Sequence, residues 1–303
     1  METEISASSR VIKRCHVYWF GKLVYFMRLF HSAVFALFFF AAVVSGFAQA
    51  PAGGRGNAAD RSKPKPLTGE MHIQYYFAEA GEASPYHLYV PTTYDGKTAL
   101  SLIVIFHGGG QSEDTPFTRT NGQLQKLAEE HGYIVISPFG YRSTAFFGNT
   151  WPIPKGSNTA APATDQQQAY ALAEKDVLNL IDITEKEYKI DPAHVFLMGN
   201  SMGGQGIFHL AAKYPDRWAA IAPSDCPLDP AFYPFDKIKN IPAMYIHGDA
   251  DKTYPVEMGR AMAEAMKAHG ENVTYVEVKG GEHPTSWPQV LPQIIDFFDQ
   301  HKK

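Results

Sequence analysis

Residues 199–203, Gly-Asn-Ser-Met-Gly, form a G-x-S-x-G motif between an apolar run at 195–198 and a segment of helical periodicity at 202–213. In such a strand–turn–helix setting, the motif predicts a sharp turn that presents the hydroxyl group of Ser201 at the N-terminus of a helix. The two glycines remove the Cβ atoms that would collide in so tight a turn. Because a helix N-terminus favours developing negative charge, we expect Ser201 to act as a nucleophile.

Acyl transfer by a serine also needs a base to take its proton and an acid to orient the base. For the chain order Ser…Asp…His, the base among the twelve histidines is predicted to be His283, in the turn-rich loop 279–287. The predicted acid is Asp251, which closes the segment His-Gly-Asp-Ala-Asp just after an apolar run. Asp249 is its rival, although its side chain is also suited to cap the turn, and Asp225 is a further alternative after the preceding strand.

The oxygen of a tetrahedral intermediate needs backbone N–H groups that stabilise its negative charge. The first is expected from Met202, the residue after the nucleophile. The second is expected from the segment His-Gly-Gly-Gly at 107–110, because glycine lets a backbone approach the substrate closely. Gly109 is the preferred donor, and Gly110 is the alternative donor and a candidate substrate contact. His107 is expected to stabilise the turn rather than to act as a base.

Apolar runs and helical patterns alternate along the chain from residue 100 onward. Continuous apolar strands separated by helices predict a parallel sheet that is covered on both faces. Strands are predicted at 100–106, 133–137, 195–198, 219–222, 243–247 and 273–278, and helices at 122–131, 165–188, 202–213, 256–269 and 288–301. Upstream, segments 71–78 and 86–90 predict an antiparallel hairpin. The expected fold class is therefore α/β, with a mostly parallel central sheet, an antiparallel N-terminal hairpin and helices on both faces.

Residues 139–164 interrupt this alternation with aromatic side chains that follow no period. So long a loop is often functional, and this one follows the C-terminal end of a strand, where ligands bind in such sheets. Two interpretations stay open, namely a wall of the substrate site and a surface loop whose aromatic side chains pack on the core. Trp151, Trp287 and Phe147 are candidate substrate platforms, and core packing explains each of them equally well.

The first 48 residues have the pattern of a targeting segment. A basic region precedes an apolar, aromatic stretch that ends in small residues, as in a secretory signal. Cleavage is expected after Ala48 or Ala50, with secretion or release into the periplasm and no stable membrane association afterwards. A retained membrane anchor is the alternative. Because the basic region is unusually long, residues 1–26 are interpreted as an extension upstream of the true start.

Residues 49–69 are rich in Gly, Pro and Lys and predict a flexible linker, which leaves 70–303 as a single catalytic domain. A chain of 303 residues with 45% hydrophobic residues is long enough to bury one large core. The one cysteine after the targeting segment is Cys226, so no intrachain disulfide is expected there, and its thiol is expected to be packed.

The net charge of −4 gives no indication of a nucleic-acid partner. The sequence contains no H-E-x-x-H, C-x-x-C or G-x-x-x-x-G-K-[ST] motif. We therefore expect neither a metal ion nor a nucleotide or other cofactor.

Taken together, these stretches resemble the α/β-hydrolase superfamily over residues 70–303. The matching segments are 105–110, 189–204, 211–218, 247–251 and 281–283. The chain is most similar to a group of secreted esterases that includes feruloyl and acetylxylan esterases, polyhydroxybutyrate-depolymerase-like proteins and predicted peptidases. In such proteins the acid is the Asp that closes H-G-x-x-D, and the resemblance thus implies Asp251.

This resemblance implies a serine carboxylesterase that acts through an acyl-enzyme on aryl or acyl esters, of the feruloyl or acetyl type, in small molecules or attached to a polymer. A serine peptidase and a polyester depolymerase are the alternatives, since one scaffold hosts several chemistries. A non-catalytic binding protein fits less well, because binding requires none of the three residues of a triad.

Overall fold

The computed structural model describes residues 66–159, 166–270 and 272–302. The expected targeting segment at 1–48, and all of the expected linker except its last four residues, lie outside these ranges. Within the described ranges, no helix combines the length and the apolar character that are needed to cross a membrane.

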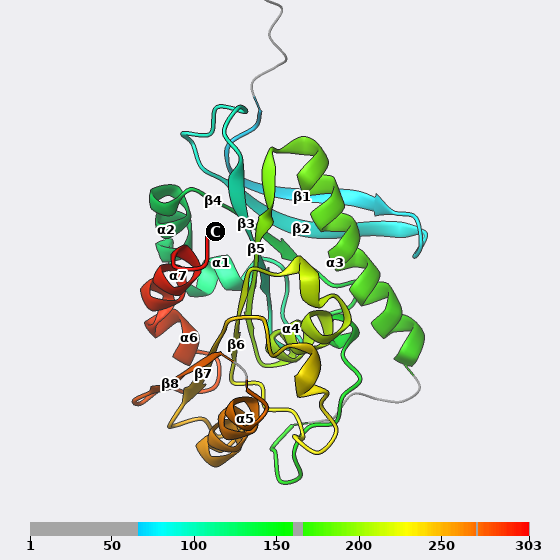
Figure 1. The fold of residues 1–303 in the computed structure, drawn as a ribbon. Coiled ribbons are helices and arrows are strands. Elements are labelled where there is room, and N and C mark those ends of the chain that lie inside the picture. The colour runs from blue at the N-terminus through cyan, green and yellow to red at the C-terminus, as the bar shows by residue number, and fades with distance from the viewer. Residues whose placement is uncertain (1–65, 160–165, 271, 303) are drawn as a thin grey trace, which may run out of the picture. The chain divides into compact units, whose positions relative to one another are not determined.

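A central sheet of eight strands carries the fold (Figure 1). Its strands are β1 (Gly69–Phe77), β2 (Glu82–Val90), β3 (Leu100–Phe106), β4 (Tyr133–Pro138), β5 (Ile190–Asn200), β6 (Ala220–Ser224), β7 (Ala243–Gly248) and β8 (Val273–Val278). They lie side by side in the order β1-β2-β4-β3-β5-β6-β7-β8. The pairs β1–β2 and β2–β4 are antiparallel, and the other neighbours are parallel. This arrangement confirms the predicted fold class.

Successive side chains of a strand point to opposite sides of the sheet. Both faces of this sheet are therefore apolar, and helices cover both of them. In β3, Leu102 and Val104 belong to one core cluster, whereas Ile103 and Ile105 belong to the other. The first cluster is completed by α3 (Gln167–Glu187), α4 (Met202–Lys213) and α5 (Val256–Ala268). The second is completed by α1 (Thr115–Arg119), α2 (Gln123–His131), α6 (Ser286–Gln289) and α7 (Leu291–Asp299).

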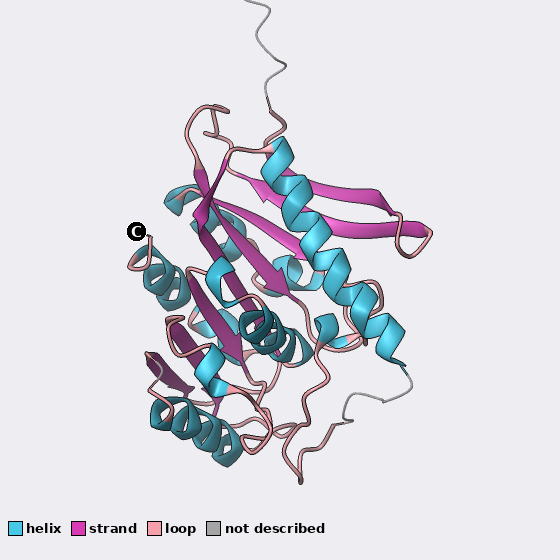
Figure 2. Ribbon diagram, turned by 45° about the vertical axis from the view of Figure 1, so that its right-hand side comes forward, coloured by secondary structure: helices cyan, strands magenta, loops and turns pink. Residues whose placement is uncertain are grey.

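The long helix α3 runs beside the β1–β2 hairpin (Figure 2). The hydroxyl of Tyr75 on β1 donates a hydrogen bond to Oδ1 of Asp176 on α3 at 2.6 Å. The other carboxylate oxygen of Asp176 accepts from the backbone N–H of Gly140 at 2.9 Å. One buried carboxylate thus connects the hairpin, α3 and the start of the loop that follows β4.

Several predicted elements differ from the structure, and β5, for example, begins at Ile190 rather than at residue 195. The second hairpin strand begins at Glu82 rather than at residue 86, because the turn after β1 is shorter than expected. The predicted helix 288–301 is wrong as a single element, since it is broken at Val290 into α6 and α7. Pro292 explains the break, because it has no N–H to donate to the preceding turn.

The loop after β4 packs its aromatic residues inward. Phe147, in the 3-10 turn Phe146–Gly148 (η1), is 1% exposed, and its ring centroid lies 4.7 Å from that of Phe106. A Cβ atom on Gly206 of α4 would lie 2.6 Å from Cβ of Phe147, so only glycine lets the loop approach the helix so closely. For Phe147, the interpretation as a core residue holds rather than that of a substrate platform.

Candidate active site

Ser201 lies in a strained turn between β5 and α4. Its backbone has φ 56° and ψ −125°, values that a non-glycine residue adopts only where the surroundings enforce them, at a cost of about 1–3 kcal/mol. A Cβ atom at Gly199 would lie 2.7 Å from the carbonyl oxygen of Phe106, and one at Gly203 would lie 2.6 Å from the same atom. The two glycines of the motif thus let the turn pack directly on β3.

The structure brings Ser201, His283 and Asp251 together from three separate loops. Nε2 of His283 lies 2.8 Å from Oγ of Ser201, and Nδ1 of His283 lies 2.8 Å from Oδ2 of Asp251. A carboxylate can only accept, so the imidazole proton is on Nδ1, and the lone pair of Nε2 faces the serine hydroxyl. The three side chains therefore form one continuous hydrogen-bonded series.

Asp251 is held in place by its own turn. Its Oδ1 accepts hydrogen bonds from the backbone N–H groups of Thr253 at 2.7 Å and Tyr254 at 2.9 Å. Burial by itself raises the pKa of this carboxyl, but the bond from His283 and the two backbone donors outweigh burial and lower the pKa below its ordinary value. The carboxylate is therefore ionised and fixed in orientation at neutral pH.

The loop that carries His283 packs against the loop that carries Asp251. The N–H of Ala250 donates to the carbonyl oxygen of Gly281 at 3.0 Å. A Cβ atom at Gly248 would lie 2.1 Å from that same oxygen. Asp249, the rival candidate for the acid, accepts instead from the N–H of Gly280 at 2.6 Å, so its carboxylate holds the turn of the histidine loop and makes no bond with the imidazole.

Asp225, the third candidate for the acid, lies behind the site. It is fully buried, and its carboxylate accepts hydrogen bonds from the N–H of Gly248 and from the hydroxyl of Ser286. Burial raises its pKa to about 7, against the lowering effect of those donors. Asp225 therefore connects the ends of β6 and β7 to the histidine loop. Sequence reasoning missed this connection, although the position of Asp225 at the end of a strand had marked it as a candidate.

The segment 107–110 lies beside the start of α4. A Cβ atom on Gly109 would lie 3.8 Å from Cβ of Met202. Met202 is the first residue of α4, so its N–H has no acceptor within the helix. The N–H of Gly110, the alternative donor, is already bonded to the carbonyl oxygen of Ser143 at 2.8 Å. The geometry therefore favours Gly109 over Gly110 as the partner of Met202.

Three other histidines near the sheet are engaged elsewhere. Both ring nitrogens of the buried His107 face backbone carbonyl oxygens, those of Gly108 at 2.8 Å and Phe139 at 3.0 Å. His247 is buried, and its Nε2 lies 2.9 Å from a backbone carbonyl oxygen. Nε2 of His209 lies 2.7 Å from the carboxylate of Glu174. None of these three rings bonds to Ser201.

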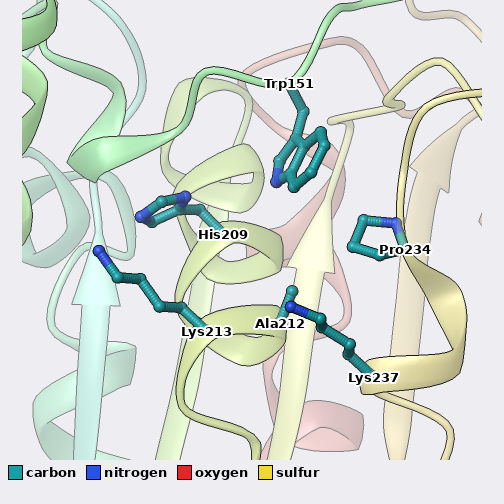
Figure 3. A pocket seen from close by; sticks show the side chains of 6 residues that line it. All are labelled: Trp151, His209, Ala212, Lys213, Pro234 and Lys237. Carbon is teal, nitrogen blue, oxygen red and sulfur yellow. The ribbon is translucent and has the colours of Figure 1, made fainter.

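The two tryptophans proposed as substrate contacts have different surroundings. Trp287 is 3% exposed within the core cluster of α6 and α7, so the expectation of a substrate platform is corrected to a packing role. Trp151 lies in the wall of a cavity of about 200 Å³ on the outer side of α4 (Figure 3). The residues that line this cavity are Trp151, His209, Ala212, Lys213, Pro234 and Lys237. No member of the Ser–His–Asp series is among them.

Cys226 is buried, as expected, and its Sγ atom fills the space beside α4. A Cβ atom at Gly204 would lie 2.4 Å from that sulfur atom. Burial raises the pKa of the thiol well above its ordinary value, which leaves it protonated and unreactive at neutral pH.

The fold and the hydrogen-bonded Ser–His–Asp series define an α/β-hydrolase with the side-chain arrangement of a serine hydrolase. Residues 78–298 match the family described as "Putative esterase", and the chain belongs to this family.

Curated relatives with a described activity match parts of the chain. A bifunctional acetylxylan esterase/xylanase of Neocallimastix patriciarum is 27% identical over 179 residues, which are 59% of this chain and 23% of that protein. Feruloyl esterase B of Neurospora crassa is 29% identical over 134 residues, which are 44% of this chain and 41% of the relative. The chain thus aligns with less than half the length of either relative.

Solved structures show the same fold. The S-formylglutathione hydrolase from Agrobacterium tumefaciens gives a TM-score of 0.60 at 14% identity, over 77% of this chain and 94% of that one. A ferulic acid esterase from Anaeromyces mucronatus gives a TM-score of 0.54 at 18% identity, over 78% of this chain and 91% of that one.

Proposed function

We propose that the protein is a serine hydrolase of carboxylic esters, with Ser201 as nucleophile, His283 as general base and acid, and Asp251 as the group that orients the imidazole. The observation that carries this proposal is the pair of 2.8 Å contacts that join Ser201 to His283 and His283 to Asp251. These distances lie within hydrogen-bond reach for proton transfer and for orientation of the base.

The reaction follows from this geometry in two halves. Nε2 of His283 takes the hydroxyl proton as Oγ of Ser201 attacks the ester carbonyl carbon, and the proton then passes to the leaving alcohol as the acyl-enzyme forms. In the second half, the same nitrogen takes a proton from water as the water oxygen attacks the acyl carbon, and it then returns this proton to Oγ of Ser201 as the bond to Oγ breaks and the acid is released. Asp251 stays ionised throughout and stabilises the imidazolium that forms in each half.

The oxyanion is assigned to the N–H groups of Met202 and Gly109. The supporting observations are the position of Met202 at the N-terminus of α4 and the close approach of Gly109 to it. Loss of one such donor typically costs about 3–4 kcal/mol of transition-state stabilisation. The assignment leaves Gly110 as a turn residue whose N–H is occupied.

For the substrate we propose acetyl or feruloyl esters, on small molecules or attached to polysaccharide, because the relatives with described activities are acetylxylan and feruloyl esterases. Serine peptidase and polyester depolymerase activity are the competing proposals. A panel of p-nitrophenyl acetate, methyl ferulate, acetylated xylan, a polyhydroxyalkanoate and a peptide amide separates them. Cleavage of the amide or of the polyester in preference to the first three compounds would refute the proposed substrate class.

The chemistry itself is tested with Ser201→Ala on p-nitrophenyl acetate. We expect the turnover to fall to the background rate and the acyl-enzyme, detected by intact mass after rapid quenching, to disappear. Undiminished hydrolysis by the variant would exclude Ser201 as the nucleophile.

We also propose that the protein is exported, with cleavage after Ala48 or Ala50, on the basis of the basic, apolar and small-residue pattern of the first 48 residues. N-terminal sequencing of the protein that its cells release tests this proposal. An N-terminus upstream of the apolar stretch would contradict it.

A further inference from the structure

A second cluster of titratable side chains lies on the β1–β2 hairpin and contains no residue of the Ser201 site. His72 of β1 and His87 of β2 stand directly opposite each other in the antiparallel pair, with ring centroids 4.1 Å apart. Glu70 lies two residues before His72 and therefore on the same face of β1. One ligand atom from each of Glu70, His72 and His87 falls within 4.8 Å of the others.

The ring of His87 is held in a fixed orientation. Its side chain is 1% exposed, and the ring stacks on Phe117 of α1 with centroids 3.8 Å apart. Nδ1 of His87 lies 2.9 Å from Oδ1 of Asp114, the residue before α1. Since the carboxylate accepts, this bond places the imidazole proton on Nδ1 and leaves a lone pair on Nε2.

Nε2 of His87 lies close to a second acceptor. Nε2 lies 2.9 Å from Oε1 of Glu70, yet this buried nitrogen makes no well-aligned hydrogen bond. A histidinium that donated to both carboxylates would align its second N–H with Glu70, which the geometry does not show. Two acceptors at this distance repel each other unless a cation beside them is bound by both Nε2 and the carboxylate.

His72 also lies beside Asp114. Its Nδ1 is 2.9 Å from the same Oδ1 atom that accepts from His87. A carboxylate that accepts the remaining N–H of a metal-binding histidine is a recurring feature of zinc sites, where it fixes the tautomer and the ring orientation. Asp114 stands in this relation to His87, and the same oxygen lies within reach of His72.

We propose that Glu70, His72 and His87 bind a divalent transition-metal ion of the zinc type, with Asp114 orienting the imidazole ring of His87. Two imidazole nitrogens and one carboxylate oxygen form a ligand set suited to such ions. Glu70 and His72 are exposed, so water has access to the remaining coordination position. The ion connects the edge strand β1 to β2, and through Asp114 to the start of α1.

Zinc titration by calorimetry tests this site on the untagged, metal-stripped protein. We expect the wild-type protein to bind ZnCl₂ at the hairpin and its melting temperature to rise as this site fills. His72→Gln and Glu70→Gln are chosen because both side chains are exposed, so the packing of His87 on Phe117 is kept, and circular dichroism verifies the fold. Each variant should weaken zinc affinity by at least about tenfold, and Asp114→Asn by about 10–100-fold.

The matched control is His269→Gln, which removes an exposed histidine outside the cluster and should leave zinc affinity unchanged. Absence of zinc binding in the wild type would overturn the proposal. Equal affinity in the wild type, His72→Gln and Glu70→Gln would overturn it as well, because zinc would then be bound elsewhere, for example at His283. Parallel assays of ester hydrolysis identify that case, since zinc at His283 would inhibit the wild type and both variants equally.

Discussion

The buried carboxylate of Asp225 accepts a hydrogen bond from the hydroxyl of Ser286, three residues after His283 in the chain. The same carboxylate accepts from the N–H of Gly248, which precedes the Asp251 turn. The loop that supplies the proposed base and the strand that leads to the proposed acid are therefore joined through a residue at the end of β6.

Removal of this connection should impair catalysis without removing a reacting group. For Ser286→Ala we expect kcat to fall by about tenfold, because the histidine loop loses one of its anchors, and stability to fall by about 1–3 kcal/mol from the unpaired acceptor. Steady-state kinetics and urea unfolding measure the two effects. Thr285→Ala, an exposed neighbour, is the control. Equal kinetics for wild type and Ser286→Ala would contradict a positioning role.

The pH dependence of stability should show the raised pKa of Asp225. Its pKa is about 7 in the folded protein against 3.8 as the ordinary value, so the folded state binds the proton more tightly between these pH values. The contribution of Asp225 to stability therefore falls as pH rises from 4 to 7, by up to about 4 kcal/mol. Asp225→Asn keeps the shape and removes this titration.

Urea unfolding of wild type and Asp225→Asn at several pH values between 5 and 8 measures this contribution by difference. We expect the Asn variant to gain stability relative to the wild type as the pH rises. A difference that stays constant over this range would show that Asp225 titrates alike in the folded and the unfolded protein.

The two carboxylates in the segment 247–251 should differ sharply in their effect on rate. Asp251→Asn is expected to lower kcat by about 10⁴-fold, because the imidazole loses the acceptor that sets its tautomer. Asp249→Asn should change kcat by less than about tenfold, since an amide oxygen still accepts from Gly280. Both are measured with p-nitrophenyl acetate. A larger loss in the Asp249 variant would assign the role of the acid to Asp249.

Close contact between two backbones makes Gly248 sensitive to a single methyl group. In Gly248→Ala the new Cβ atom would lie 2.1 Å from the carbonyl oxygen of Gly281, so the acid and histidine loops must move apart. We expect kcat to fall by about 10²-fold, the typical effect of a misplacement of about 1 Å at a reacting centre. Gly81→Ala, in a hairpin turn with open space around it, should leave kcat unchanged. Comparable kcat values for both variants would refute the argument.

Local patterns predicted most of the elements, because burial on both faces imposes continuous apolar strands and the helices retain their own periodicity. The strand at Leu100–Phe106 and the helix at Met202–Lys213 have the predicted bounds. The break at Val290 was missed, since the apolar periodicity continues across Pro292 and conceals the lost hydrogen bond.

Motif and chain order are sufficient to nominate Ser201, His283 and Asp251, because each follows a strand that ends at the same edge of the sheet. The sequence by itself favoured Asp251 but left Asp249, two residues away in the same turn, open as a rival. Only the tertiary structure directs one carboxylate to the imidazole and the other to the N–H of Gly280.

The cluster of Glu70, His72 and His87 on the β1–β2 hairpin shows even more clearly what local sequence cannot predict. Glu70, His72, His87 and Asp114 match no local metal-binding spacing, so the sequence indicated no metal ion. Strand register places His72 opposite His87, and the packing of α1 brings Asp114 to both rings. Local pattern determined which residues form strands, helices and the G-x-S-x-G turn, whereas contacts between distant segments depend on register and packing, which only the folded chain decides.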